Sequence, residues 1–318
     1  KFGISRMLPE SIKLVSGPGC PVCVTSLQFI DHAIALSRLK NTIITTYGDL
    51  IRVPGSTSSL EKEKSRGSDI RMVYSTLEAL SIARQNPAKQ VVFLGIGFET
   101  TSPASAAALI QARKENISNF SLLSAHKIMP PAMEAIVDEE VKIDGYLAPG
   151  HVSTITGSQI YQNIPQKFSL PVVVSGFEPV DILQSVNMLI HQITDHNPRV
   201  EIQYKRVVKP GGNAKAQSVM NEVFNLRDDW WRGLGVLSQS GFSIGEEYAE
   251  WDAEKKIEVE IEPTLEPKGC ICGEILKGIK SPVDCKLFGN ICNPGNPVGT
   301  CMVSGEGACQ AYYKYGTA

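Results

Sequence analysis

Six of the eight cysteines lie near the C-terminal end of the 318-residue chain, at positions 270, 272, 285, 292, 301 and 309. Thiolates that converge from irregular sequence spacings are typical ligands of iron–sulfur clusters, which use four of them. A reducing compartment also favours metal ligation or redox chemistry over permanent disulfides. The segment therefore predicts one iron–sulfur cluster and a spare pair of thiols beside it.

The six cysteines can be divided between ligands and spare thiols in more than one way. The division that we favour assigns four to the cluster, namely Cys270, Cys285, Cys292 and Cys309. Cys272 and Cys301 are then neighbours that can form a disulfide. Composition leaves open a division in which Cys272 replaces Cys270, or Cys301 replaces Cys309. A structural zinc site is the alternative, although zinc ribbons usually have paired Cys-x-x-Cys knuckles, which this segment lacks.

The other two cysteines form the sequence Cys20-Pro21-Val22-Cys23, between a predicted strand at 12–15 and a predicted helix at 25–39. Amide groups at the N-terminus of a helix lower the pKa of a thiol and favour the thiolate. We therefore predict a redox-active dithiol at Cys20 and Cys23. Half of a zinc site is the alternative, but no second pair of Cys or His lies close in sequence.

Two further candidate site residues follow predicted strands. Glu99 comes after the strand at 91–96, in Gly-Phe-Glu-Thr-Thr, and His151 comes after the strand at 146–147, in Pro-Gly-His-Val-Ser. Functional groups of α/β proteins gather at the carboxyl ends of parallel strands. Glu99 could instead complement a helix dipole, and an isolated histidine is as often structural. We expect His151, ahead of His126, to face a cleft.

Short apolar runs alternate with helical patterns along the chain, which is typical of parallel sheets covered on both faces. Strands are predicted at 12–15, 42–46, 70–73, 91–96, 120–124, 146–147, 172–174 and 201–208. Helices are predicted at 25–39, from about 58, from about 75, and at 102–114, from 130, 157–161, 180–193 and 214–224. The predicted fold is α/β, with two similar parallel-sheet domains flanking a cleft.

The amino-acid composition changes after residue 228, where Gly-rich turns lead to an acidic linker at 258–262. The segment that follows is rich in Gly, Pro and Asn and has too few large apolar residues for a core, so a metal site must stabilise it. We predict a first α/β domain at 1–117, a second at 118–254, and a small C-terminal iron–sulfur domain at 255–318.

Composition excludes some classes of function. A net charge of −2 provides no broad basic field for nucleic acid. No apolar run approaches the roughly 18–20 residues that span a bilayer, and the first residues lack an apolar signal core. We therefore expect a cytoplasmic protein that binds neither nucleic acid nor membrane.

Four motifs together resemble the HypD family of nickel–iron hydrogenase maturation factors. They are Gly-Pro-Gly-Cys-Pro-Val-Cys at 17–23, Gly-Phe-Glu-Thr-Thr at 97–101, Pro-Gly-His-Val-Ser at 149–153 and Asp-Cys-Lys-Leu-Phe-Gly at 284–289. The resemblance implies a scaffold, rather than a conventional turnover enzyme, on which an iron carrying two cyanides and one carbon monoxide is assembled. It also implies two partners, the small chaperone HypC and the cyanide donor HypE.

The resemblance further implies roles for individual residues. Cys270, Cys285, Cys292 and Cys309 would hold a [4Fe–4S] cluster, Cys272 with Cys301 and Cys20 with Cys23 would be redox-active pairs, and Glu99 and His151 would belong to the assembly cleft. The family's N-terminal Cys-Gly-x-His motif does not occur here, so we expect either a truncated sequence or a different coordination of the iron. An iron–sulfur-dependent disulfide reductase and a zinc-stabilised interaction protein are the rival functions.

Overall fold

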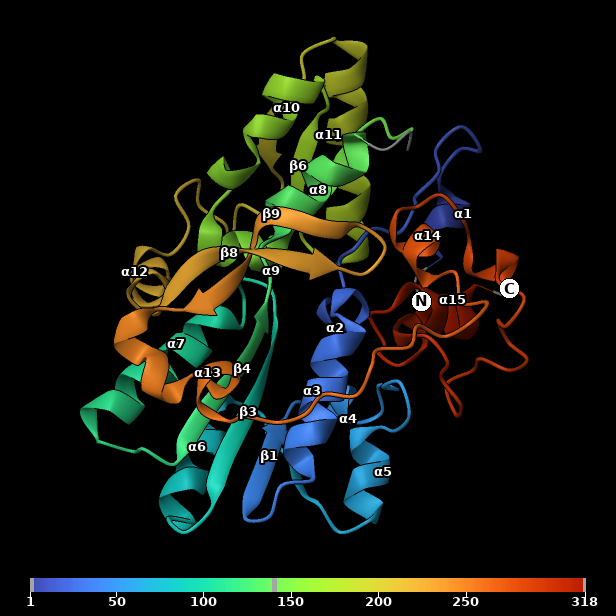
Figure 1. Cartoon of the computed structure of the whole chain (residues 1–318). Helices are drawn as coiled ribbons and strands as arrows, with labels where there is room; N and C mark the ends of the chain where they lie inside the picture. Colours follow the sequence, from blue (N-terminus) through green and yellow to red (C-terminus); the bar gives the residue numbers. More distant parts are fainter. Residues whose placement is uncertain (1–2, 139–141, 317–318) are drawn as a thin grey trace.

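The structure is a computed structural model that describes residues 3–138 and 142–316. Figure 1 shows two layers of strands and helices, one above the other, with the cysteine-rich C-terminal segment beside α1 and α2. The antiparallel pair β8 and β9 lies between the two layers. The chain is therefore α/β, as predicted, with a separate cysteine-rich segment at one side.

The first sheet contains four parallel strands in the order β2-β1-β3-β4. Its strands are Thr42–Thr46 (β1), Asp69–Met72 (β2), Gln90–Gly97 (β3) and Phe120–His126 (β4), and its main helices are Leu27–Ser37 (α3), Leu60–Ser65 (α5), Thr76–Gln85 (α6) and Ser102–Lys114 (α7). Successive residues of a strand point to opposite faces. Ile44 and Val92 therefore share a core with α3, while Ile43 and Val91 share a second core with α6 and α7. The predicted covering of both faces is confirmed.

The second sheet contains three parallel strands in the order β5-β6-β7. Its strands are Tyr146–Pro149 (β5), Val172–Ser175 (β6) and Val200–Ile202 (β7), and the neighbouring helices are Met129–Asp138 (α8), Gly150–Thr156 (α9), Asn163–Phe168 (α10) and Pro179–Thr194 (α11). α11 packs against β6, but its predicted apolar stripe is buried only in part: Val186 is buried, whereas Ile190 and Ile193 are exposed. The first turn of α9, which contains His151, and the loop that contains Phe177 follow the carboxyl ends of β5 and β6.

An antiparallel hairpin that the sequence did not predict joins the first layer to the rest. Its strands are Phe224–Trp231 (β8) and Gly235–Ile244 (β9), with one bulge in their pairing. The hairpin is fixed to β4, because Ser124 Oγ donates to Phe242 O at 3.2 Å and Ile128 N donates to Ser240 O at 2.9 Å. The segment after residue 228 is thus part of the fold, and the linker begins only after α13.

The remaining elements are short, apart from α12 and α15. They are Ile4–Met7 (α1), Pro21–Val24 (α2), Gly48–Ile51 (α4), Gln159–Tyr161 (η1), Ala214–Val223 (α12), Glu246–Trp251 (η2), Ala253–Lys256 (α13), Cys272–Leu276 (α14), Pro282–Asp284 (η3), Thr300–Met302 (η4) and Ala308–Tyr315 (α15). Polar caps begin several helices: Ser26 caps α3, Ser75 caps α6 and Asn213 caps α12. None of the helices in the described part of the chain has the length and apolar character needed to traverse a bilayer.

Some predicted elements are wrong. Residues 12–15 run as coil, with Leu14 and Val15 at 41% and 58% exposure. An apolar run is not sufficient for a strand, because these residues pair with none of the described strands. The helix predicted at 157–161 begins earlier, at Gly150, and only the turn η1 follows it. The strand predicted at 201–208 ends at Ile202, where the chain turns.

The strand that was expected to begin the second α/β unit belongs to the first sheet. β4 pairs in parallel with β3 over its whole length, from Phe120 opposite Val91 to His126 opposite Gly97. The first sheet therefore extends past residue 117. The three domain ranges as such stay a prediction.

Candidate metal and thiol site

The first pair of cysteines lies at the start of α2. Cys20 is the N-cap residue of this helix, its Sγ accepts a hydrogen bond from Cys23 N at 3.3 Å, and the two residues are joined by a disulfide bond. Pro21 occupies the first helical turn, where its missing N–H costs nothing. The predicted helix N-terminus at the pair is confirmed, although the helix is the short α2 and α3 follows it. Both cysteines are buried.

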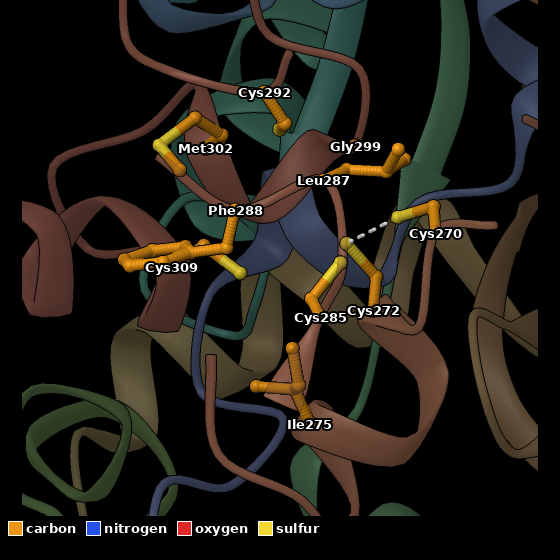
Figure 2. A pocket seen from close by; sticks show the side chains of 10 residues that line it. All are labelled: Cys270, Cys272, Ile275, Cys285, Leu287, Phe288, Cys292, Gly299, Met302 and Cys309. Carbon is orange, nitrogen blue, oxygen red and sulfur yellow. Dashed lines mark hydrogen bonds between the residues drawn. The ribbon is translucent and has the colours of Figure 1, made fainter. Parts of the chain in front are cut away.

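Five of the six C-terminal cysteines line one cavity, shown in Figure 2. These are Cys270, Cys272, Cys285, Cys292 and Cys309. The other lining side chains that Figure 2 labels are apolar and include Ile275, Leu287, Phe288 and Met302. Cys270 Sγ donates a hydrogen bond to Cys272 Sγ at 3.2 Å. The four ligands that we favoured are therefore brought together, and Cys272 joins them.

The cysteines that line this cavity suit an iron–sulfur cluster, but the present volume of the cavity is too small for one. Thiolates with an apolar surround are the usual donors to such clusters. The cavity measures about 10 Å³, which is roughly the space of one water molecule. A cluster would thus require the cysteine loops to move apart. Within the described ranges, no group of three or more His, Cys, Asp or Glu side chains is arranged to hold a single metal ion.

Gly299 forms the part of the cavity wall that lies against two of the sulfurs. A Cβ at this position would lie 2.5 Å from Cys272 Sγ and 2.6 Å from Cys270 Sγ. Real Cβ atoms do not approach other atoms so closely. The two sulfurs therefore occupy the space that any other residue would fill with its side chain.

Cys301 lies behind the cavity and contacts two of its cysteines. It is fully buried, and it interacts through hydrogen bonds with Cys272 and Cys309. These hydrogen bonds raise the pKa of Cys301, whereas hydrogen bonds with Cys272 and Cys301 lower the pKa of Cys309. The structure thus brings the proposed spare pair, Cys272 and Cys301, into contact. It leaves the choice between Cys272 and Cys270 as a ligand open, because both line the cavity.

The two thiol sites are neighbours in space, which sequence spacing did not indicate. Thr300 Oγ1 donates a hydrogen bond to Cys23 O at 3.1 Å, and η4, which contains Cys301, packs against α2. Arg232, in the turn between β8 and β9, holds the same helix from another side, because its backbone N donates to Val24 O at 3.0 Å. The Cys20–Cys23 pair and the cysteine cavity therefore belong to one packed region.

Glu99 lies at the end of β3 but is buried. Its Oε1 accepts a hydrogen bond from Met129 N at 3.1 Å, and its Oε2 has no hydrogen-bond partner among the described residues. Burial raises the pKa of Glu99 to about 7. His126, on the neighbouring strand, is also buried, and burial lowers its pKa to about 4. Neither side chain is exposed, so both differ from the accessible groups that the strand-end positions predicted.

His151 does lie at the carboxyl end of the second sheet, on the first turn of α9 instead of in a loop. Its imidazole is exposed and stacks on the ring of Phe177, with 4.0 Å between ring centroids and 29° between planes. Phe177 belongs to the Gly-Phe-Glu sequence at 176–178, which repeats the one at 97–99. That repeat was the one signal in the sequence that pointed to Phe177. Thr300 and Arg232 had no such signal.

The fold and the site define a class: an α/β protein whose buried Cys-Pro-Val-Cys pair lies beside a cavity lined by cysteines. Residues 1–316 match the HypD family, which carries the description "Hydrogenase formation hypA family". The chain belongs to this family. The resemblance drawn from the four motifs is therefore confirmed.

Relatives from bacteria and an archaeon cover almost the whole chain. It is 46% identical to the hydrogenase maturation factor HypD2 of Bradyrhizobium diazoefficiens, over 99% of this chain and 86% of that protein. It is 47% identical to a putative hydrogenase expression/formation protein of Methanocaldococcus jannaschii (99% and 88%) and 43% identical to HypD of Escherichia coli (99% and 85%). These matches support a role in hydrogenase maturation. The cluster, its ligands and the partners stay predictions.

Proposed function

We propose that this protein is a scaffold for assembly of the iron unit of nickel–iron hydrogenase, an iron carrying two cyanides and one carbon monoxide. We also propose that thiol redox chemistry accompanies the assembly. The observation that carries the proposal is the contact between the two thiol sites, in which Thr300, beside Cys301, donates to the backbone of Cys23. This contact keeps the two thiol sites in one packed region, as redox chemistry between them requires.

The cysteine cavity is the proposed site of a [4Fe–4S] cluster. Its ligands would be Cys270, Cys285, Cys292 and Cys309, all of which line the cavity. When bound, such a cluster supplies single electrons. Cys272 and Cys301, which contact each other, would form the thiol pair beside it.

Cys20 and Cys23 are the proposed redox pair at the other end of this region. Reduction of their disulfide consumes two electrons and two protons and yields two thiols, and the reverse reaction releases them. In the thiol form, the N–H of Cys23 that points at Cys20 Sγ stabilises a thiolate at Cys20. A soft thiolate of this kind suits low-valent iron.

The proposed partners are a HypC-type small chaperone and a HypE-type cyanide donor, and the proposed location is the cytoplasm. Support for these comes from the family alone. His151 is exposed at the end of the second sheet, where a partner or the iron cargo could reach it. Glu99, which is buried, would act only by shaping the region around it.

The test is anaerobic co-purification of the protein with a HypC-type chaperone, followed by iron, zinc and labile-sulfide analysis and by infrared spectroscopy. We expect iron and sulfide in the cysteine-rich C-terminal segment. We also expect infrared bands of iron-bound cyanide and carbonyl in the complex. Zinc without sulfide would reject the cluster. Iron and sulfide without the infrared bands, together with turnover of a disulfide substrate, would favour a disulfide reductase instead. The matched control is the Cys20→Ala, Cys23→Ala variant, which should keep the sulfide and lose the bands.

A further inference from the structure

We propose that Tyr204 and Arg206, which lie outside all four motifs, are positioning residues that fix the orientation of His151. The proposal rests on the role proposed above for His151 in the assembly site. Its evidence is a chain of contacts at the carboxyl ends of β5, β6 and β7, which runs from an anchored ion pair to the exposed imidazole.

The first contact of the chain fixes the backbone next to His151. Gly150 begins α9 so close to the end of β6 that a Cβ there would lie 2.4 Å from Ser175 O and 2.9 Å from Tyr204 Cδ1. Only glycine permits this approach. The backbone that carries His151 is therefore set by Tyr204 and by the last residue of β6.

The ring of Tyr204 lies beside Gly150, which begins the helix that carries His151, and beside Gly176, which precedes Phe177. It meets Phe177 edge-on, with 6.1 Å between centroids and 87° between planes. On its other edge, a Cβ at Gly176 would lie 2.9 Å from Tyr204 Cδ2. Edge-to-face contacts of aromatic rings have a preferred geometry. Tyr204 thus orients Phe177, and the stack with Phe177 in turn orients His151.

Arg206 holds Tyr204 in place. Its guanidinium carbon lies 4.4 Å from the centroid of the Tyr204 ring, and its two terminal nitrogens donate to Asp181 at 2.8 and 2.5 Å. Asp181 also accepts from Gln203 Nε2 at 2.9 Å and from Glu178 N at 3.2 Å. A two-pronged pair of this kind restricts the guanidinium plane as well as its place. The buried Asp181 is therefore the fixed end of the array.

An orientation fixed in this way matters for an exposed side chain. A surface imidazole ordinarily samples several rotamers, whereas His151 has one face held against Phe177. Groups that must meet a reacting centre lose rate steeply when they are displaced. Tyr204 and Arg206 therefore act on assembly through His151 and need not touch the iron.

The test measures the orientation of His151 directly. In protein labelled at histidine, the His151 ring signals, assigned with the His151→Ala variant among the five histidines, should be displaced upfield by the face of Phe177. We expect Tyr204→Leu to move these signals toward the position of a free histidine. Tyr204→Phe, which keeps the ring, should leave them in place. Arg206→Met, at a side chain 54% exposed, should keep the fold and shift the signals in the same direction as Tyr204→Leu.

The second measurement is assembly, followed by the infrared bands formed per protein chain. We expect Tyr204→Leu to lose up to about a hundredfold in the rate of band formation, with iron and sulfide content unchanged, and Tyr204→Phe to restore the rate. Unmoved His151 signals in both Tyr204→Leu and Arg206→Met would overturn the proposal, as would equal loss in Tyr204→Phe. A His151→Ala variant with full assembly would refute the role of His151, while the NMR result would still decide what positions it.

Discussion

Replacement of Gly299 by alanine is the sharpest test of the cysteine cavity. The backbone of Gly299 has φ −104° and ψ 150°, a conformation that alanine adopts freely. The added Cβ would nevertheless lie 2.5 Å from Cys272 Sγ and 2.6 Å from Cys270 Sγ. Any loss of stability in Gly299→Ala must therefore come from crowding against these sulfurs.

The expected magnitude follows from two opposing effects. Overpacking by one methyl group in a close-packed region costs about 1–3 kcal/mol of the free energy of unfolding. Alanine also restricts the unfolded chain, which returns about 0.4–1 kcal/mol. We therefore expect a net loss of up to about 2.6 kcal/mol in the metal-free protein, and weaker cluster binding because the sulfurs are displaced.

Gly305→Ala is the matched control, because a Cβ at Gly305 meets no atom within 4 Å. This variant should be neutral or slightly stabilised. Urea unfolding of the two variants and the wild type gives the free energies, and iron and labile sulfide per chain give cluster content. The reasoning fails if Gly299→Ala matches Gly305→Ala in both measurements, because the sulfurs would then not occupy the space beside residue 299.

Two further predictions concern single side chains. Cys285→Ala should abolish the visible absorbance of the cluster and Cys301→Ala should largely retain it, because Cys285 lines the cavity and Cys301 does not; equal loss would refute the division of ligands. Glu99→Gln should become more stable relative to wild type as pH rises from about 4.5 to above 7. Burial raises the pKa of Glu99 from 4.5 to about 7, so its contribution to stability is full below pH 4.5 and is lost above 7, by up to about 3 kcal/mol. Urea unfolding at pH 5 and pH 8 measures this, and parallel pH dependences would contradict it.

The sheets were predictable because their sequence pattern has a direct physical cause. A strand buried on both faces, such as β3, reads as a nearly continuous apolar run. The helices α3 and α6 begin after Ser26 and Ser75, whose hydroxyls accept hydrogen bonds from free amides of the first turn. A local sequence pattern does not show whether a partner strand will pair with the segment. Leu14 and Val15 form an apolar run, but the segment pairs with none of the described strands.

The hairpin β8–β9 was missed for the opposite reason. The sequence of β8 carries Arg, two Asp and two Trp, and its burial does not alternate, because a bulge between Arg227 and Asp229 changes the register. Lys127, the residue after β4, stabilises this strand: its buried ammonium donates to Asp229 Oδ2 at 2.8 Å and to Trp230 O at 2.7 Å. A strand held by contacts more than 100 residues away leaves little trace in its own sequence.

The candidate site, like the fold, could be predicted from the sequence only in part. Cysteine count and spacing were enough to predict that the C-terminal thiols converge, since a segment so poor in large apolar residues must be held by something else. They were insufficient to rank Cys272 against Cys270, because both sulfurs meet at Gly299 and only three-dimensional contact reveals it. The contact between Thr300 and Cys23 could not be predicted from the sequence for the same reason.

The cysteine-rich segment owes its position to a shared core. Ile275 and Met302 from this segment pack in the same apolar cluster as Val22 of α2 and Trp231 of β8. The coil that precedes the segment therefore does not set the separation of the two thiol sites; side-chain packing sets it. Opening the cavity to admit a cluster must move residues that also contact α2. If the proposed cluster binds in the cavity, its binding and the environment of Cys23 would therefore be coupled through η4, which packs against α2, and a redox scaffold with two thiol sites would require such coupling.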